Sequence, residues 1–314
     1  MTNHNVTREK FAGCLFGLAV GDALGAPYEG LPADLIRDIG PAKRLATNPE
    51  NKKLFYTDDT EMMIGVAETL VAHQRIDSEY LASRFAENFH PERGYGSGAH
   101  QQIVMIQDGH HYSDCWYKVF PDGSYGNGAA MRVAPVGLLF CHDIDRLLKE
   151  SELSANVTHA HELGIEGANL IAMAIAAVIK MDRFDRTAFF DLLVPRCRTE
   201  EFSWQMQTLR ELERDALMTF GNSLEAHRSV VTAIQIFVDN PEDYTEVMRS
   251  AIGMGNDVDT LCAMSGAISG AYLGVDAIPK PLIERFENTA NGRDRIIELA
   301  NQLYDLWQSQ ECKM

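Results

Sequence analysis

The chain lacks the features by which nucleic-acid-binding and exported proteins are recognised. Its 28 Lys and Arg residues are outnumbered by 45 Asp and Glu residues, which gives 314 residues a net charge of −17, and the basic residues form no cluster. Such a surface repels phosphate backbones and anionic lipid, so we expect neither a nucleic acid nor a membrane as a direct partner. Residues 1–10 are polar and contain no apolar run of the secretory kind, so we expect no export.

Paired cysteines, linker sequence and internal repeats are also missing. No Ser/Gly or Pro run is long enough to separate two bodies, and no repeat recurs at a fixed period. We therefore expect one domain over residues 1–314, and a monomer. The cysteines form no CxxC pair and several lie in apolar helical patterns, which favours reduced thiols and a cytoplasmic protein; they are Cys14, Cys115, Cys141, Cys197, Cys262 and Cys312.

Alternating strand patterns are scarce, whereas helical periodicity runs through the chain. With 46% apolar residues the chain can bury a core, and apolar side chains recur at three- and four-residue spacing. The sequence therefore predicts a compact all-α fold. The predicted helices are Phe11–Leu24, Glu61–Ala72, Glu79–Phe89, Gly164–Lys180, Ala188–Leu193, Ser203–Met218, Ala226–Val238, Tyr244–Ile252, Leu261–Leu273, Pro281–Asn288 and Asp294–Ser309.

Two apolar segments resemble membrane spans but are better explained as buried helices. Ala168–Met181 is shorter than the roughly 20 residues that a bilayer requires. Leu261–Leu273 follows Asp257 and Asp259, which lipid would exclude, and its Gly266 and Gly270 suit close helix packing in a soluble core.

Acidic residues cluster before two of the predicted helices. The first cluster, Thr57-Asp58-Asp59-Thr60-Glu61, precedes an apolar face. One Asp or Thr there would serve as a helix N-cap, whereas two adjacent carboxylates with flanking hydroxyls suit a hard cation such as Mg²⁺ or Mn²⁺. The residues alone leave a cap and a metal site about equally favoured.

The second cluster, Gly253-Met254-Gly255-Asn256-Asp257-Val258-Asp259-Thr260, lies late in the chain. It does not follow the EF-hand pattern, but its glycines allow the loop to curl so that two carboxylates converge. If folding brings the two predicted helix starts together, four carboxylates and the Thr hydroxyls would suit two metal ions about 3.5–4 Å apart.

Further candidate residues lie on turns. Glu29 follows Pro27 after a helix rich in small residues, and it is either a site residue or an ordinary solvated Glu. The glycine-rich runs Arg93–Gly98 and Gly123–Gly128 could present backbone N–H groups to a phosphate, and Tyr95 or Tyr125 could stack on a purine. His159, taken alone, is more often a structural histidine than a ligand-binding one.

In this order, the motifs resemble the ADP-ribosylglycohydrolase family over nearly the whole chain. The similar blocks are FAGCLFGLAVGDALGAPYEG, YTDDTEM, GSYGNGAAMRVAP, THAHELGIEGA, GNSLEAHRSVVTAI, and MGNDVDT with AMSGAISGAYLG after it. RGYGSG, GSYGNGAAMRVA and GNSLEAHRSVVTAI look most like the branch that removes ADP-ribose from serine and degrades poly(ADP-ribose). The resemblance implies an all-α, compact orthogonal multi-helix bundle with two Mg²⁺ ions, or Mn²⁺ in their place.

The resemblance also implies a set of site residues. Thr57, Asp58 and Asp59 match one group of metal ligands, Asp257, Asp259 and Thr260 match the other, and Glu29 matches the glutamate near the second metal. The positions that match loops around the pyrophosphate, ribose and adenine are Gly96, Ser97, Gly98, Gly123, Ser124, Tyr125, Gly126, Asn127 and His159. One position departs from the family pattern: Asn256 replaces a usual glycine, although Asn tolerates left-handed backbone better than most residues.

The implied reaction is hydrolysis of the bond between C1″ of the distal ribose of ADP-ribose and an oxygen. The substrates would be ADP-ribosylated proteins, with serine linkages favoured, or poly(ADP-ribose), and Glu29, Asp58 and Asp257 are the candidate catalytic carboxylates. The residues leave open which carboxylate is the general base. Alternatives are a hydrolase of arginine-linked ADP-ribose, or an immunity or structural protein on the same scaffold.

Overall fold

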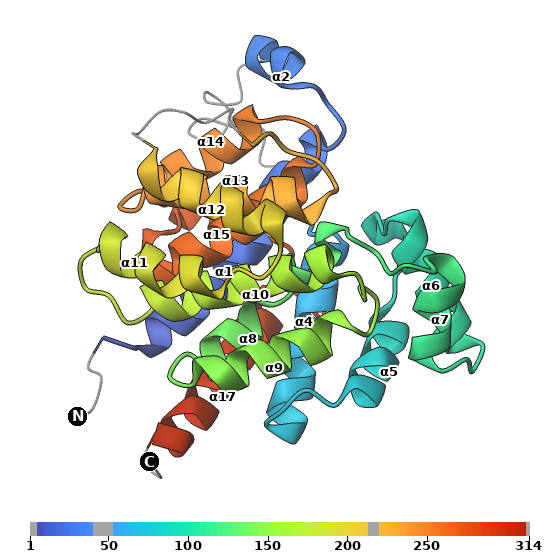
Figure 1. Ribbon diagram of the computed structural model, residues 1–314. Helices are drawn as coiled ribbons and strands as arrows, with labels where there is room; N and C mark the ends of the chain where they lie inside the picture. Colours follow the sequence, from blue (N-terminus) through green and yellow to red (C-terminus); the bar gives the residue numbers. More distant parts are fainter. Residues whose placement is uncertain (1–4, 40–52, 213–219, 312–314) are drawn as a thin grey trace.

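The structure, a computed structural model, describes residues 5–39, 53–212 and 220–311, and these fold into helices without any strand among them (Figure 1). The prediction of an all-α fold is therefore confirmed. The α-helices are α1 (Arg8–Gly25), α2 (Ala33–Ile39), α4 (Asp58–His73), α5 (Ser78–Asn88), α6 (Ser97–Gln107), α7 (Tyr112–Val119), α8 (Ala134–Leu139), α9 (Ile144–Ala155), α10 (Glu162–Val178), α11 (Arg186–Leu193), α12 (Glu200–Glu211), α13 (Ala226–Asp239), α14 (Tyr244–Gly253), α15 (Val258–Leu273), α16 (Lys280–Arg285) and α17 (Arg293–Glu311).

Helices α1 and α15 form the centre of the fold and run antiparallel. A Cβ atom on Gly270 would lie 1.9 Å from the carbonyl oxygen of Gly13, and one on Gly25 would lie 2.5 Å from Cα of Asp259. Glycine is required at such positions because the two backbones touch. The C-terminal end of α1 therefore meets the N-terminal end of α15, where the late acidic motif begins.

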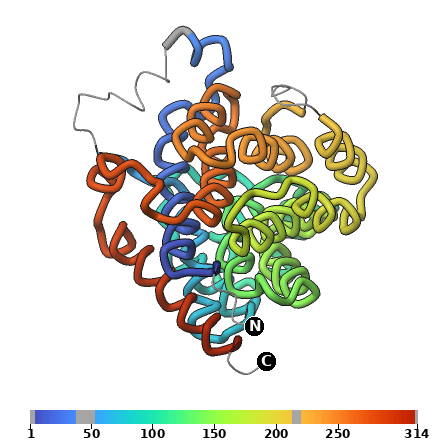
Figure 2. Tube along the Cα trace, turned by 90° about the vertical axis from the view of Figure 1, so that its left-hand side faces the viewer, coloured from blue at the N-terminus to red at the C-terminus, as the bar shows by residue number. Residues whose placement is uncertain are grey.

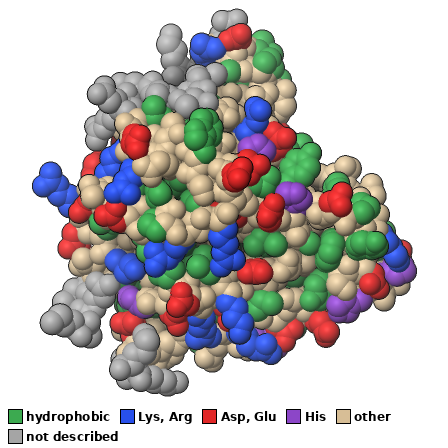
Figure 3. Space-filling view, viewed as in Figure 1, with side chains coloured by type: hydrophobic (Ala, Val, Ile, Leu, Met, Phe, Trp, Pro, Cys, Tyr) green, Lys and Arg blue, Asp and Glu red, His purple; other side chains and the backbone are tan. Residues whose placement is uncertain are grey.

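Other helices pack around this central pair. Helix α10 lies among α8, α9 and α13, and α17 packs along α1 and α4. Figure 2 shows α17, in red, beside the blue α1. Helices α6 and α7 form a lobe at the right of Figure 1 that packs on α5. On the face shown in Figure 3, Lys and Arg side chains of the described residues are interspersed with Asp and Glu.

One described segment, Arg8–Tyr28, is long and apolar enough by length and composition to cross a membrane. It comprises α1 and the short 3₁₀ turn Ala26–Tyr28, and 83% of its most apolar stretch is buried inside the protein. Packing of α1 against α15 and α17 accounts for this apolar composition.

Each predicted helix coincides with an observed one, but several boundaries were wrong. Helix α4 begins at Asp58 instead of Glu61, and α15 begins at Val258 instead of Leu261, because apolar periodicity does not register an acidic first turn. Helix α16 ends at Arg285, short of the predicted Asn288. Helix α12 ends at Glu211, and the rest of the predicted Ser203–Met218 extends into residues 213–219, which lie outside the described residues.

Five observed helices were not predicted, namely α2, α6, α7, α8 and α9. The correction matters most at α6, because Ser97 and Gly98 form its first turn and not a loop. Glycine at three of five positions between Gly94 and Gly98 obscured the helix start. The turn-rich sequence of Pro49–Lys53 predicts a loop, and of these residues only Lys53 is among those that the structure describes.

Candidate functional site

A pocket of about 230 Å³ opens between the ends of α4, α6 and α15. Its lining falls into an acidic part, a glycine-rich part, and a set of larger side chains that includes Phe120 and Leu224. The acidic and glycine-rich parts come from segments far apart in the sequence, and the fold places them around one cavity. The described residues that line it and had been predicted as site residues are Glu29, Asp58, Asp59, Gly96, Ser97, Gly98, Ser124, Gly126, Asn127, His159, Asp257, Asp259 and Thr260.

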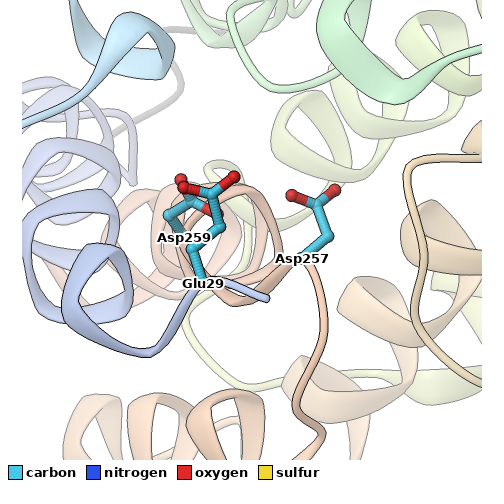
Figure 4. A group of neighbouring side chains, drawn as sticks. All are labelled: Glu29, Asp257 and Asp259. Carbon is cyan, nitrogen blue, oxygen red and sulfur yellow. The ribbon is translucent and has the colours of Figure 1, made fainter. Parts of the chain in front are cut away.

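Three carboxylates form the tightest part of the acidic lining. Oxygen atoms of Glu29, Asp257 and Asp259 all lie within 4.8 Å of one another. Figure 4 shows Glu29 and Asp259 close together, with Asp257 directed toward the same space. Asp257 and Asp259 are buried, whereas Glu29 is exposed. Such a set of oxygen ligands suits a hard divalent cation.

Backbone contacts between two loops hold Glu29 beside Asp257. The amide of Gly30 donates to the carbonyl of Asn256 at 2.8 Å, and the amide of Asn256 donates to the carbonyl of Leu31 at 2.7 Å. Asn256 adopts a left-handed conformation with φ of 61°, which Asn tolerates. The turn therefore forms despite the departure from the family glycine.

Thr57, Asp58 and Asp59 lie at the start of α4. Thr57 is the N-cap, and its hydroxyl oxygen accepts the amide of Asp59 at 3.4 Å. Because Thr57 caps the helix, Asp58 and Asp59 are its first two residues and are not needed as caps. The Thr260 hydroxyl donates to Asp59 at 3.4 Å, which ties the start of α4 to the start of α15.

Asp22, for which the sequence indicated no role, organises the start of α4. Its side chain is fully buried in α1. It accepts hydrogen bonds from the amide and hydroxyl of Thr57 at 3.0 and 2.8 Å, and from the amide and hydroxyl of Thr60 at 3.1 and 2.5 Å. A single acidic residue within the apolar, glycine-rich stretch of residues 11–25 in α1 was the signal that could have revealed it.

In the absence of a cation, burial and mutual repulsion disfavour the ionised forms of the acidic residues that line the pocket and of Asp22 beside them. Burial raises the pKa of Asp22 to about 6. Burial, followed by the charge of Asp22, raises the pKa values of Asp58 and Asp59 well above the ordinary range. Burial and the charge of Asp257 raise the pKa values of Glu29 and Asp259. These carboxylates repel one another because burial removes the water that would screen their charges, and a bound cation would relieve that repulsion.

Two buried carboxylate oxygens without hydrogen-bond partners support a cation among the acidic residues of the pocket. Oδ1 of Asp59 and Oδ1 of Asp259 are buried and have no hydrogen-bond partner. A buried carboxylate oxygen without a partner is costly unless a ligand occupies its lone pairs. Together with the carboxylates grouped around Glu29, they fit divalent metal ligation.

The start of α6 and the surroundings of His159, which also line the pocket, have the features of an anion site. Helix α6 begins at Ser97 without a side-chain cap, so its first amides are free to bind a ligand. Gly128 lies against the His159 ring, because a Cβ at that position would be 2.8 Å from the ring Cε1. Burial and the charge of Arg132 lower the pKa of His159 to about 3, so the ring is neutral.

The two parts are linked by Asn127. Its side-chain amide donates to Oδ2 of Asp257 and to the Ser229 hydroxyl at 3.0 Å. Its backbone amide donates to the carbonyl of Leu224 at 3.0 Å. Asn127 thus orients one acidic residue of the cluster while it shapes the glycine-rich turn.

Four predicted residues do not line the pocket. Thr57 and Gly123 are not among the lining residues, and a Cβ on Gly123 would be 2.3 Å from the amide nitrogen of His161. Tyr125 is half exposed and packs edge-on against the His161 ring. Tyr95 is buried with its hydroxyl bonded to Glu61, so of the two tyrosines that could stack on a purine, Tyr125 is the more accessible one.

Several lining residues were not singled out from the sequence. Arg132 is fully buried, and Gln102 is 1% exposed with an unpartnered Oε1. Phe120 and Leu224 are exposed apolar residues at the pocket, with exposed fractions of 37% and 68%. Helical periodicity did not reveal them, because each becomes part of the site only through tertiary contacts.

The chain is similar to known proteins over nearly its whole length. The family model described as ADP-ribosylglycohydrolase matches residues 3–312. The chain is 30% identical over 348 residues to ADP-ribosylhydrolase ARH3 of Gallus gallus, covering 95% of this chain and 93% of that protein. It is 31% identical over 350 residues to ADP-ribosylhydrolase ARH3 of Bos taurus, with coverage of 95% and 93%. A solved structure of an ADP-ribosylglycohydrolase-related protein complex is similar with a TM-score of 0.73 and 25% identity, covering 95% of this chain and 98% of that one.

Proposed function

Because the chain belongs to the ADP-ribosylglycohydrolase family, we propose that it is a Mg²⁺-dependent hydrolase of serine-linked ADP-ribose and of poly(ADP-ribose). The family assignment makes it a glycosidic hydrolase that acts on ADP-ribosylated substrates. The linkage and the metal are the proposed parts. Relatives named ADP-ribosylhydrolase ARH3 cover nearly the whole chain, and the motifs RGYGSG and GSYGNGAAMRVA favour the serine and polymer branch.

One observation supports the proposal above all others. The carboxylate cluster of Glu29, Asp257 and Asp259 lies in the same pocket as the glycine-rich turn, His159 and the start of α6. A ribose hydroxyl is a suitable ligand for a hard cation held by carboxylates, and a diphosphate is a suitable ligand for free backbone amides. ADP-ribose carries both groups, with a diphosphate next to its distal ribose.

The residues that would hold two Mg²⁺ ions, or Mn²⁺ ions, are divided between two helix starts. They are Thr57, Asp58 and Asp59 at the start of α4, and Asp257, Asp259 and Thr260 at the start of α15, with Glu29 beside them. When bound, such ions supply Lewis acidity toward hydroxyl and water oxygens. Asp22 and Asn127 keep these residues in position, through Thr57 and Thr60 and through Asp257 respectively.

Glu29 is the best placed general base. It is the exposed member of a cluster whose other members, Asp257 and Asp259, are buried, so it can exchange protons with solvent. In the proposed reaction, the oxygen of a water molecule forms a bond to C1″ and its proton passes to Glu29. The bond from C1″ to the serine oxygen or to the oxygen of the adjoining ADP-ribose breaks, and the leaving oxygen takes up the proton that Glu29 received from the water, which returns Glu29 to its ionised form.

The anion part of the pocket holds the substrate during this step. Ser97 and Gly98 line the cavity at the uncapped start of α6, where their backbone amides can donate to the diphosphate, and a neutral His159 adds a side-chain contact. Binding the diphosphate there would fix the distal ribose over the carboxylates, which lowers the entropy cost of reaching the transition state.

An ADP-ribose release assay tests the proposal. Serine-linked, arginine-linked and polymeric substrates are compared with added Mg²⁺ and with a chelator. We expect release from serine conjugates and polymer that depends on Mg²⁺. Release from arginine conjugates alone would overturn the linkage, and release that is unchanged by the chelator would overturn the metal requirement.

A further inference from the structure

Arg132 is a buried cation that forms no ion pair with a carboxylate of the described residues, although the charge of Asp58 acts on it from a distance. It is the largest of the fully buried side chains, with an exposed fraction of 0%, and its guanidinium lies 4.6 Å from the centre of the Phe85 ring. Burial lowers its pKa to about 9, so it remains protonated at neutral pH. Burying a positive charge without a paired carboxylate is unfavourable. The groups that its guanidinium contacts therefore indicate the role of Arg132.

The contacts of Arg132 lead directly to His159. Nη2 of Arg132 donates to the Thr158 hydroxyl oxygen at 2.8 Å and to the carbonyl of Ser154 at 3.1 Å. The same hydroxyl oxygen lies 2.7 Å from Nδ1 of His159. Thr158 is fully buried, so water cannot supply it with other partners.

The direction of these hydrogen bonds follows from their donors. Arginine can only donate, so the Thr158 oxygen accepts from Arg132. The hydroxyl hydrogen then has one acceptor within reach, Nδ1 of His159. If Nδ1 carried the proton instead, the buried hydroxyl hydrogen would have no acceptor. This cost lowers the population of the Nδ1–H tautomer about tenfold or more relative to the Nε2–H tautomer.

We propose that Arg132 is a positioning residue that acts through the Thr158 hydroxyl to hold His159 in the Nε2–H tautomer, with this donor facing the pocket. The ring edge that carries Nε2 faces the glycine-rich turn: a Cβ on Gly126 would lie 3.4 Å from Nε2, and one on Gly128 would lie 3.0 Å from it. Nε2 makes no hydrogen bond to any other described residue, and His159 lines the pocket.

A fixed Nε2–H group makes His159 a dedicated hydrogen-bond donor. An anionic oxygen of the ligand accepts from it, whereas the opposite tautomer would place a lone pair against that oxygen. The hydrogen-bond chain itself rests on the contacts above. The identification of the diphosphate of ADP-ribose as the group that accepts from Nε2–H rests on the proposed function.

Nitrogen-15 NMR of the histidine rings tests the hydrogen-bond chain in the full-length protein without ligand. The His159 signals are assigned by their loss in His159→Gln. We expect a protonated Nε2 and an unprotonated Nδ1 at neutral pH. In Arg132→Met the Thr158 oxygen is free to accept from Nδ1–H, so a fraction of that tautomer should appear. Lys180→Met is the matched control, since it removes a part-buried cation that donates to Cys141 outside the pocket; it should leave the signals unchanged.

Binding of ADP-ribose provides the second measurement. Thr158→Val removes the hydroxyl but keeps the Arg132 charge, and it should raise the Kd for ADP-ribose about tenfold. Thr158→Ser restores the hydroxyl and should bind within about twofold of the wild type. A protonated Nδ1 in the wild-type protein, or wild-type affinity in Thr158→Val, would overturn the proposal. If the wild type does not bind ADP-ribose at all, the proposed function fails, and the NMR result still decides the tautomer.

Discussion

Removing divalent cations should make the acidic cluster take up protons, so Mg²⁺ affinity should fall steeply with decreasing pH. The perturbation is a change from pH 8 to pH 5 in chelator-treated protein that is then titrated with Mg²⁺. The reason is that burial and mutual repulsion raise the pKa values of Asp22, Asp58, Asp59 and Asp259, whereas a bound cation favours the ionised forms.

The pKa of Asp22 gives the size of the free-energy cost of ionising one buried carboxylate of this region. Its pKa of about 6 compares with an ordinary value of 3.8, and this difference corresponds to about 3 kcal/mol at high pH. Because the folded-state pKa is raised, the difference is a penalty for ionising Asp22: the stability of the cation-free fold is at its full value below about pH 4 and is lower by about 3 kcal/mol once the pH has risen through about 6. At pH 5 such a carboxylate is protonated by about ten to one, and expelling its proton costs about 1.4 kcal/mol. At pH 8 the same cost is close to zero.

Calorimetric titration measures this effect. We expect Mg²⁺ affinity to fall by at least about tenfold from pH 8 to pH 5, with a larger loss if Asp58, Asp59 and Asp259 also take up protons. Titrations in two buffers of different ionisation enthalpy should show proton release on binding near pH 6. Asp294→Asn removes an exposed acid on α17 and is the control. Equal affinity at both pH values, or binding without proton release, would refute the reasoning.

Three other substitutions test the site and the core. Asp257→Asn should lower kcat/KM for ADP-ribose release by more than about 100-fold while circular dichroism remains unchanged, because it removes a charge from the cluster; near-normal turnover would contradict its role. Gly128→Ala places a Cβ 2.8 Å from the His159 ring and should raise KM for ADP-ribose by about tenfold with little change in melting temperature. Gly270→Ala places a Cβ 1.9 Å from a carbonyl oxygen of α1 and should lower the free energy of unfolding by about 2–4 kcal/mol in urea denaturation. Gly253→Ala, which meets no atom within 4 Å, is the control for both glycine substitutions and should behave as the wild type.

Local sequence features predicted the interior helices well and their first turns poorly. Apolar spacing located α10 and α13, whose buried faces recur every three or four residues. It placed the start of α4 at Glu61, because Thr57, Asp58 and Asp59 are polar yet buried, and their burial depends on Asp22 from α1. The same limit hid α6, whose first turn contributes free amides and not apolar side chains.

Of the candidate site, the sequence predicted the residues that are locally unusual and missed those whose role depends on their neighbours in space. Asp257 and Asp259 stood out because a packed helical protein has little use for two acids before an apolar helix. Asp22, Arg132 and Gln102 did not stand out in this way. Each lies in a stretch typical of an ordinary helix or turn, and its role comes only from residues that the fold brings next to it.

The sequence by itself determined the helical class of this protein and the acidic and glycine-rich motifs, because periodicity and unusual residue types are local properties. Only the tertiary structure decided which motifs meet. The glycines of α1 and α15 let the two backbones touch in antiparallel order, and this brings Glu29 to Asp257 and Asp259 although more than half the chain separates them. A cation site and a buried cation such as Arg132 depend on distances and on exclusion of water, and both arise only when distant segments pack together.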